Sequence, residues 1–301
     1  MILKLLKFYT KIKRIISKMW KYFIIQILNL NIVETNKFNG LILSVNTIET
    51  GGKAYFKSET YSEVVNPFYD AIQNTYDPDL VLDIGANYGF TSILYASVFK
   101  NARIVAVEPS SKLCKYIKKN KNNNKLQNID VIRAICDSEN GIKKEFSINP
   151  LYSQDNRVKG SSFLWRKEVM ETISIDTIIT QYSPSRFVYI KIDTQGFEKF
   201  VFLGAENFLL NNNNWLIKTE FCPDALIKQG VEPYELLTYL IDKYDVVDFS
   251  GQVCFKDKSV LNSFKDKITK NDITSFIDYV ISLDTSKIGW TELLVKNKKL
   301  K

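Results

Sequence analysis

Short apolar segments alternate with amphipathic segments along most of this chain, and that alternation constrains the fold more than any other feature. The apolar segments have the length of buried strands, and the segments between them have helical periodicity. The expected strands span residues 80–84, 103–107, 129–134, 187–192, 215–220, 246–249 and 292–295. Continuous apolar strands that alternate with helices are typical of a mostly parallel sheet. The pattern predicts an α/β, Rossmann-like fold with a mostly parallel seven-stranded sheet and helices on both faces.

A helical and hairpin extension is expected before the first sheet strand. Strands at 41–45 and 54–56 flank Gly51-Gly52, which favours a hairpin with its turn at the glycines. A helix at 61–73 then leads into the sheet. The chain is accordingly divided into a basic amphipathic helix at 1–33, the hairpin and lead-in helix at 34–79, and one main domain at 80–301.

The charge of the chain is concentrated at its N-terminus. Seven basic residues and no acidic residue precede Glu34, so +7 of the formal net charge of +8 lies there. The rest of the chain is close to neutral, so no nucleic-acid partner is expected. Six of the seven basic residues fall at the spacing of one helical face, namely Lys4, Lys7, Lys11, Arg14, Lys18 and Lys21.

Two interpretations of this helix are open. A basic amphipathic helix with aromatic residues fits the surface of an anionic membrane. Alternatively, its apolar side packs against the protein's own domain. No uncharged run in it reaches the roughly 18 residues of a membrane-spanning helix.

The four cysteines form no C-x-x-C pair, which favours buried thiols in a reducing compartment. We therefore expect a cytoplasmic protein, either free or peripheral to a membrane.

The chain contains no histidine. A His general base, a His-containing catalytic triad and a His-ligated zinc site are therefore excluded. Acid–base chemistry in this protein has to come from carboxylates or lysines.

The clearest ligand-binding pattern lies at the carboxyl ends of the first two sheet strands, the edge at which doubly wound sheets bind ligands. The first strand runs into Asp83-Ile84-Gly85-Ala86-Asn87-Tyr88-Gly89, in which glycine lets the backbone approach a ligand closely. Glu108 ends the next strand, 25 residues after Asp83. A carboxylate there can accept hydrogen bonds from both ribose hydroxyls. The pattern predicts a nucleoside-containing cofactor.

The spacing does not favour a dinucleotide. Counted from Gly85, Asn87 and Phe90 occupy the second and third glycine positions of the G-x-G-x-x-G fingerprint. A nicotinamide-dependent oxidoreductase is therefore the weaker alternative. A catalytically silent, membrane-docked or cofactor-binding module is a third.

Five segments resemble the FkbM-type methyltransferases, a family with the class I S-adenosylmethionine-dependent fold. VLDIGANYGFT at 81–91 and VAVEP at 105–109 resemble the first two cofactor motifs of the family. IDVIRAICD at 129–137 and KTEF at 218–221 resemble its third-strand and fifth-strand segments. YIKIDTQGFEKFVFLG at 189–204 is the most specific match, because it is similar to the K-I-D-x-x-G-x-E signature.

The resemblance implies S-adenosylmethionine as cofactor and methyl transfer to a hydroxyl of a sugar, glycan or other small molecule. It covers roughly residues 39 to 249, and the final strand is consistent with the antiparallel seventh strand of the class. The implied cofactor-binding residues are Asp83, Gly85, Asn87, Gly89, Glu108, Pro109, Ala134, Asp137 and Asp193.

Three carboxylates, Asp193, Glu198 and Glu220, are the candidate catalytic groups. Asp193 ends the fourth strand beside the expected methyl group, where a carboxylate can position or deprotonate the acceptor. Asp193 and Glu220 are also placed to share a divalent cation. The simpler interpretation is that Asp193 caps a helix and Glu198 favours the helix N-terminus. The long interval from 138 to 176 carries either substrate contacts or an inert hairpin.

Overall fold

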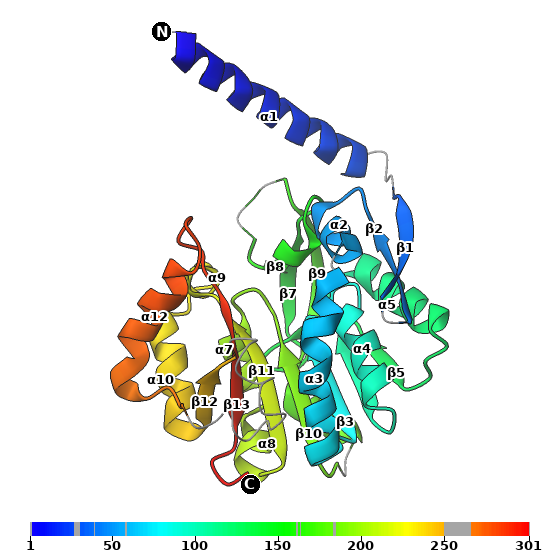
Figure 1. Ribbon diagram of the computed structural model, residues 1–301, viewed down its shortest axis with the longest axis vertical. Helices are drawn as coiled ribbons and strands as arrows, with labels where there is room; N and C mark the ends of the chain where they lie inside the picture. The colour runs from blue at the N-terminus through cyan, green and yellow to red at the C-terminus, as the bar shows by residue number, and fades with distance from the viewer. Residues whose placement is uncertain are drawn as a thin grey trace.

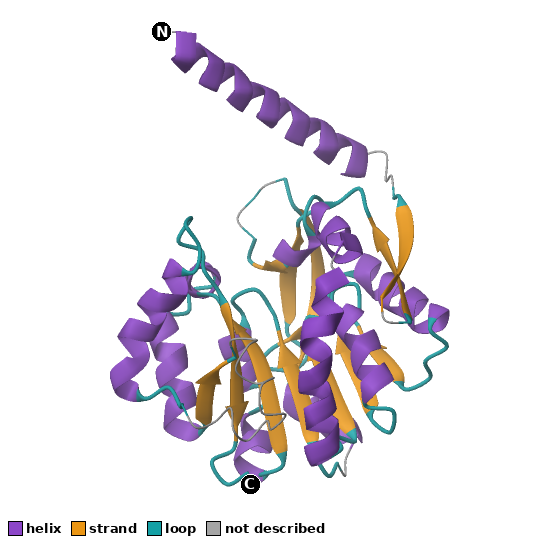
Figure 2. Ribbon diagram, viewed as in Figure 1, coloured by secondary structure: helices purple, strands orange, loops and turns teal. Residues whose placement is uncertain are grey.

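The computed structural model describes residues 2–26, 31–38, 40–57, 59–160, 162, 164–182, 185–249 and 266–300. Within them, a seven-stranded sheet has the order β12-β13-β11-β10-β3-β4-β5 (Figures 1 and 2). Its strands are β3 (Leu80–Ile84), β4 (Arg103–Val107), β5 (Ile129–Ile132), β10 (Val188–Ile192), β11 (Trp215–Phe221), β12 (Asp245–Asp248) and β13 (Thr291–Lys296). β13 is antiparallel to β11 and β12, and the other neighbours are parallel. The predicted fold class is confirmed.

The central strands are buried on both faces because their apolar runs are continuous. In β3, Leu80 and Leu82 pack into one core cluster and Val81 packs into another on the opposite face. Helices α3, α4 and α5 contribute to the cluster around Val81, and α6 to α10 with α12 contribute to the other. These helices are α3 (Glu59–Tyr76), α4 (Phe90–Val98), α5 (Ser111–Asn123), α6 (Ile175–Tyr182), α7 (Glu198–Leu203), α8 (Glu206–Asn211), α9 (Pro223–Lys228), α10 (Pro233–Lys243) and α12 (Ile273–Ser282), which follows the 3-10 turn η3 (Lys270–Asp272).

The N-terminal hairpin lies earlier in the chain than predicted. The structure has β1 (Val33–Phe38), β2 (Leu41–Asn46) and helix α2 (Thr50–Lys57) in this region. β1 pairs with β2, so the predicted strand at 54–56 and the turn at Gly51-Gly52 are wrong. Both glycines are buried inside α2, and a Cβ on Gly52 would lie 2.1 Å from the carbonyl oxygen of Asn46. The glycines serve close packing rather than a turn.

The helical segment after β10 is divided at Gly204 into the two short helices α7 and α8. A Cβ on Gly204 would lie 2.0 Å from the carbonyl oxygen of Asp137, so the break coincides with a close backbone contact. The interval from 138 to 176 contributes most of a small sheet, in the order β6-β9-β7-β8. Its elements are β6 (Ile135–Cys136), β7 (Lys143–Ile148), the 3-10 turn η1 (Ser153–Asp155), β8 (Arg157–Val158) and β9 (Arg166–Ile173).

Helix α1 (Ile2–Gln26) projects from the rest of the molecule (Figure 1). Large apolar side chains along it are exposed, with Phe8 at 63% and Trp20 at 61%, so these side chains do not pack against the domain. No described helix combines the length and the apolar character needed to cross a membrane. Cys114, Cys136 and Cys222 are free thiols, and Cys254 lies outside the described residues.

Candidate cofactor and active site

The turn after β3 has a backbone shape that few residue types adopt. Gly85, Asn87 and Gly89 have φ angles of +83°, +52° and +78°. Gly85 is also fixed by packing, because a Cβ there would lie 1.9 Å from the carbonyl oxygen of Asp193. Its N–H donates to the carbonyl of Val107 at 2.9 Å. The turn therefore holds the carboxyl ends of β3, β4 and β10 together.

Glu108 follows β4 and is buried against this turn. Its carboxylate accepts the N–H of Asn87 at 2.9 Å and the N–H of Ser110 at 2.8 Å. Burial raises the pKa of Glu108 to about 7, and the two hydrogen bonds oppose that rise. A carboxylate has about four acceptor positions, so Glu108 can still accept hydrogen bonds from ribose hydroxyls.

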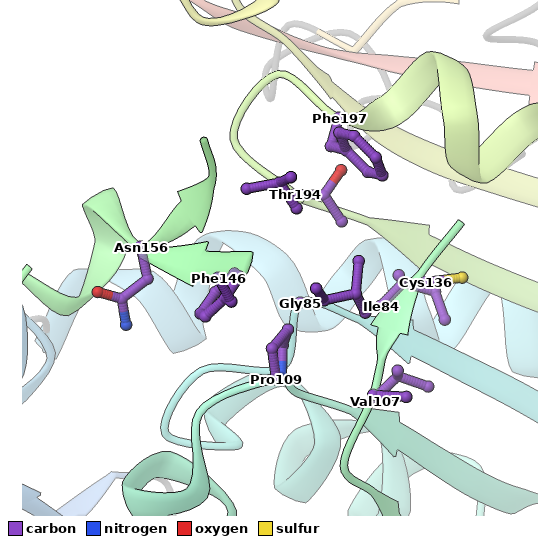
Figure 3. Close-up of a pocket in the computed structure, with 12 residues that line it drawn as sticks. Ile84, Gly85, Val107, Pro109, Cys136, Phe146, Asn156, Thr194 and Phe197 are labelled. Carbon is purple, nitrogen blue, oxygen red and sulfur yellow. The ribbon is translucent and has the colours of Figure 1, made fainter. Parts of the chain in front are cut away.

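A mostly apolar pocket opens beside the turn (Figure 3). Three residues predicted to bind the cofactor, Gly85, Pro109 and Ala134, are part of its lining. The apolar lining next to a buried carboxylate matches the chemistry of a purine and its ribose, but the pocket has a volume of only about 40 Å³, less than a nucleoside needs. The lining residues are Ile84, Gly85, Val107, Pro109, Ala134, Ile135, Cys136, Phe146, Asn156, Val158, Thr194 and Phe197.

A larger cavity of about 340 Å³ adjoins the first and shares Asn156 with it. Its lining includes Glu49, whose buried carboxylate accepts the N–H of Ser153 at 2.6 Å and so holds the start of α2 against the small sheet. Lys112 and Arg166 are the cationic residues of the lining, and burial lowers the pKa of Lys112. The lining residues are Glu49, Tyr88, Ser110, Lys112, Leu113, Ile148, Asn149, Pro150, Ser153, Asn156 and Arg166.

The ends of β10 and β11 bring Asp193 and Glu220 close together. The side-chain amide nitrogen of Gln195 connects them, at 3.1 Å from Asp193 Oδ1 and 3.0 Å from Glu220 Oε2. Lys191 Nζ lies 3.1 Å from Asp193 Oδ2 and stabilises its negative charge. The side chain of Asp193 is 36% exposed, so it can be reached by a substrate.

Glu220 lies in a different environment from Asp193. Glu220 is half-buried, and desolvation together with the charges of Asp193 and Glu198 raises the pKa of Glu220 above its ordinary value. The raised pKa favours the protonated form of Glu220. A protonated carboxyl can donate a hydrogen bond but cannot serve as the base.

Glu198 is buried and holds the turn between β10 and α7. Its Oε1 accepts the N–H of Thr194 at 2.9 Å, the hydroxyl of Thr194 at 3.0 Å and the N–H of Gly196 at 3.2 Å. Burial raises the pKa of Glu198, and the hydrogen bonds from the turn oppose the rise. These contacts match the simpler interpretation, in which Glu198 stabilises the start of the helix.

Asp83 is fully buried beneath the cofactor pocket. Its Oδ2 accepts the hydroxyls of Thr91 and Ser92 at 2.7 and 2.5 Å, and its Oδ1 lies 3.7 Å from Lys191 Nζ. Asp83 thereby fixes the first turn of α4 and the position of Lys191.

Asp137 is also buried and makes local contacts. Its Oδ1 accepts the N–H of Ser138 at 2.7 Å, and its Oδ2 pairs with Lys144. Asp83 and Asp137 have no exposed surface and are held by protein groups, which favours a supporting position over direct cofactor contact.

The carboxylate pair does not fit the divalent cation that its strand-end position suggested. No group of three or more His, Cys, Asp or Glu side chains arranged around one point occurs in the described part of the chain. An amide donor from Gln195 occupies the space between Asp193 and Glu220, and an ammonium group already neutralises Asp193.

A family model described as the methyltransferase FkbM domain matches residues 83–246, which is more than half of the chain. The chain belongs to the FkbM methyltransferase family. This confirms the resemblance of the five sequence segments and decides for a class I methyltransferase over a nicotinamide-dependent oxidoreductase.

Solved structures that resemble this FkbM protein are distant in sequence. The plantazolicin methyltransferase BamL, solved with a triazolic desmethylPZN analog and SAH, is 16% identical over 82% of this chain and 89% of its own, with a TM-score of 0.40. TYW2 of M. jannaschii, solved with AdoMet, is 12% identical over 89% and 86%, with a TM-score of 0.42. A precorrin-6y C5,15-methyltransferase from Geobacter metallireducens is 16% identical over 64% and 77%, with a TM-score of 0.39. The comparison with curated proteins found no match.

The FkbM domain also contains site residues that the motifs did not single out. Thr194 and Gln195 lie inside the segment most similar to the family signature. Their polar side chains within that signature were the sequence signal for them. Phe146, Asn156 and Val158 reach the pocket from the small sheet. The only sequence signal for these three was the unusual length of the interval from 138 to 176.

Proposed function

We propose that this FkbM methyltransferase transfers the methyl group of S-adenosylmethionine to a hydroxyl oxygen of a sugar, glycan or other small molecule. The observation that carries the proposal is the position of Asp193. It is a partly exposed carboxylate, its backbone touches the Gly85 turn, and its side chain is held by Lys191 and Gln195.

The described residues fit the cofactor in three ways. Glu108 offers free acceptor positions for ribose hydroxyls, and Gly85 is part of the lining of the apolar pocket. Pro109, Ala134 and Phe197 supply apolar surface for the adenine. The bound cofactor would supply a methyl group on a positively charged sulfur.

The residues of this chain would then handle the acceptor. A sugar hydroxyl is a weak nucleophile until its proton is being removed. Asp193 accepts that proton while the acceptor oxygen takes the methyl group, and Lys191 and Gln195 keep the carboxylate in one orientation. Glu220 accepts a hydrogen bond from the Gln195 amide and so holds it in place. Glu198 positions the turn that carries Thr194 and Gln195.

The 340 Å³ cavity is the proposed site for the part of the acceptor remote from the reacting hydroxyl, because Asp193 is not part of its lining. It adjoins the cofactor pocket through Asn156, and polar groups such as Asn149, Ser153 and Arg166 belong to its lining. Several amide, hydroxyl and cationic groups around one cavity suit an acceptor that carries many hydroxyls. On this interpretation the interval from 138 to 176 carries substrate contacts.

The test is a methyl-transfer assay with methyl-labelled cofactor and a panel of sugars, glycans, phenols, amines and thiols. Label on a hydroxyl-bearing acceptor, with a methoxy carbon signal in the product by NMR, supports the proposal. Transfer only to nitrogen, carbon or sulfur acceptors contradicts it. Cofactor binding without transfer to any acceptor, including cell extracts, would instead support the catalytically silent module.

A further inference from the structure

The methyltransferase site leaves helix α1 without a function. The helix has 25 residues and is about 37 Å long at 1.5 Å per residue. It carries several large apolar side chains. Phe8, Tyr9, Met19 and Trp20 are each more than 60% exposed. Figure 1 shows the helix pointing away from the domain.

The sequence of α1 places apolar and basic residues on different sides of a helical wheel. At 100° per residue, the exposed apolar residues fall within an arc of about 120°. They are Phe8, Tyr9, Ile12, Ile16, Met19, Trp20 and Phe23. The six regularly spaced basic positions, from Lys4 to Lys21, fall within a separate arc of about 100°. The helix contains no acidic residue.

We propose that α1 lies flat in the headgroup region of an anionic lipid bilayer and holds the protein at the membrane surface. The apolar arc would be buried at the boundary of the acyl chains, and the basic arc would meet the lipid phosphates. An anionic bilayer satisfies both arcs, whereas a nucleic acid would satisfy only the basic one. No described helix has the character of a membrane span, so the helix lies on the bilayer.

The connection between α1 and the domain makes this attachment relevant to the whole protein. The β1–β2 hairpin that follows α1 is fixed to α5 by Asn120, which accepts the N–H of Ser44 at 2.7 Å and donates to its carbonyl at 3.1 Å. The same Asn120 amide donates to the carbonyl of Tyr88, in the turn after β3, at 2.9 Å. The inference rests on the helix alone and does not depend on the proposed acceptor.

The test uses the full-length protein in co-sedimentation with vesicles of phosphatidylcholine, with and without phosphatidylglycerol. We expect binding to the anionic vesicles at low salt and release at high salt. Replacing Lys4, Lys11 and Lys18 by Gln should lower the partition coefficient on the order of 100-fold. The matched control replaces three exposed lysines of the domain by Gln, namely Lys100, Lys143 and Lys299, and should bind like the wild type.

A second pair of variants tests the apolar arc. Trp20→Ser should weaken binding about 10-fold or more, because burial of one aromatic side chain is lost. Trp290→Ser removes a tryptophan of similar exposure, 55%, from the domain and should change nothing. Circular dichroism and the thermal midpoint confirm that each variant is folded.

Four results would overturn the inference. These are no vesicle binding by the wild type, equal binding by the Lys4, Lys11 and Lys18 variant and its control, equal binding by the two tryptophan variants, and binding to RNA or DNA that competes with the vesicles. Self-association that Trp20→Ser abolishes, in the absence of vesicle binding, would assign the apolar arc to a second copy of the chain.

Discussion

At the scale of single residues, Glu108 has a raised pKa and lies between the two cavities. Of the two residues that follow it, Pro109 lines the smaller cavity and Ser110 lines the larger one. Hydrogen bonds from ribose hydroxyls favour the ionised carboxylate, so cofactor binding should release a proton. With a free-protein pKa of about 7, affinity should fall as pH drops below 7, by up to about tenfold per pH unit.

Isothermal titration of SAH at several pH values, in buffers of different ionisation enthalpy, measures both effects. Glu108→Gln should bind more weakly at pH 8 and lose the pH dependence. Glu171→Gln, an exposed carboxylate on β9, should behave as the wild type. A pH-independent affinity in the wild type would show that Glu108 does not pair with the ligand.

Asp193 and Glu220 should respond differently to the same chemical change. Asp193→Asn removes the proposed base and should lower kcat by roughly 10²–10⁴ with little change in SAH affinity. Glu220→Gln replaces a carboxyl whose raised pKa favours the neutral form by a neutral amide, so we expect kcat within a few-fold of the wild type. Equal losses in the two variants would contradict separate roles, and loss of wild-type activity on chelation would restore the metal hypothesis.

At the scale of elements, a glycine-to-alanine change in α2 should alter the free energy of unfolding in the direction opposite to that expected from helix propensity. Alanine in place of a helical glycine usually stabilises a helix by up to about 1 kcal/mol. In Gly52→Ala the new Cβ meets the carbonyl of Asn46, so we expect a loss of about 1–3 kcal/mol in the free energy of unfolding. Urea denaturation measures it, with the exposed Lys53→Ala in the same helix as the control. A stabilised Gly52→Ala would show that the two elements separate easily.

The same helix shows where sequence reasoning about elements failed. The sheet strands were predictable because a run such as that of β3 is apolar at every position, which is a local signal. Gly51-Gly52 looked like a turn because glycine is common in turns, but here it is selected by contacts with Asn46 and Ser153. The break at Gly204 has the same origin, since it depends on a backbone distant in sequence.

At the scale of the whole molecule, ligand binding should stabilise the complete domain. A ligand present at a hundredfold excess over its Kd adds about 2.7 kcal/mol to the free energy of unfolding. SAH should therefore raise the thermal midpoint by several degrees, and NAD should not. Differential scanning calorimetry with each ligand checks this, and a shift with NAD alone would argue against the cofactor.

The candidate site could be predicted only as far as it is encoded locally. Gly85, Glu108 and Asp193 follow strands whose ends were visible in the sequence, and the structure gathers them at one edge. Asn156 and Phe146 reach the same place from the small sheet, and their arrival depends on how that sheet packs. The sequence motifs therefore predict the proposed cofactor contacts, whereas the contacts made by the small sheet depend on tertiary packing.

The place of β13 also bears on how the protein is made. β13 lies between β11 and β12 although it follows both in the chain. β11 and β12 therefore do not pair with each other, and each pairs with β13. On the ribosome, the sheet strands β3, β4, β5, β10 and β11 can pair as they emerge. β12 can pair only after residues 291–296, which form β13, have left the exit tunnel. A chain that stops before residue 291 would lose an interior strand rather than an edge, and it would present the unpaired side of β11 to chaperones and proteases.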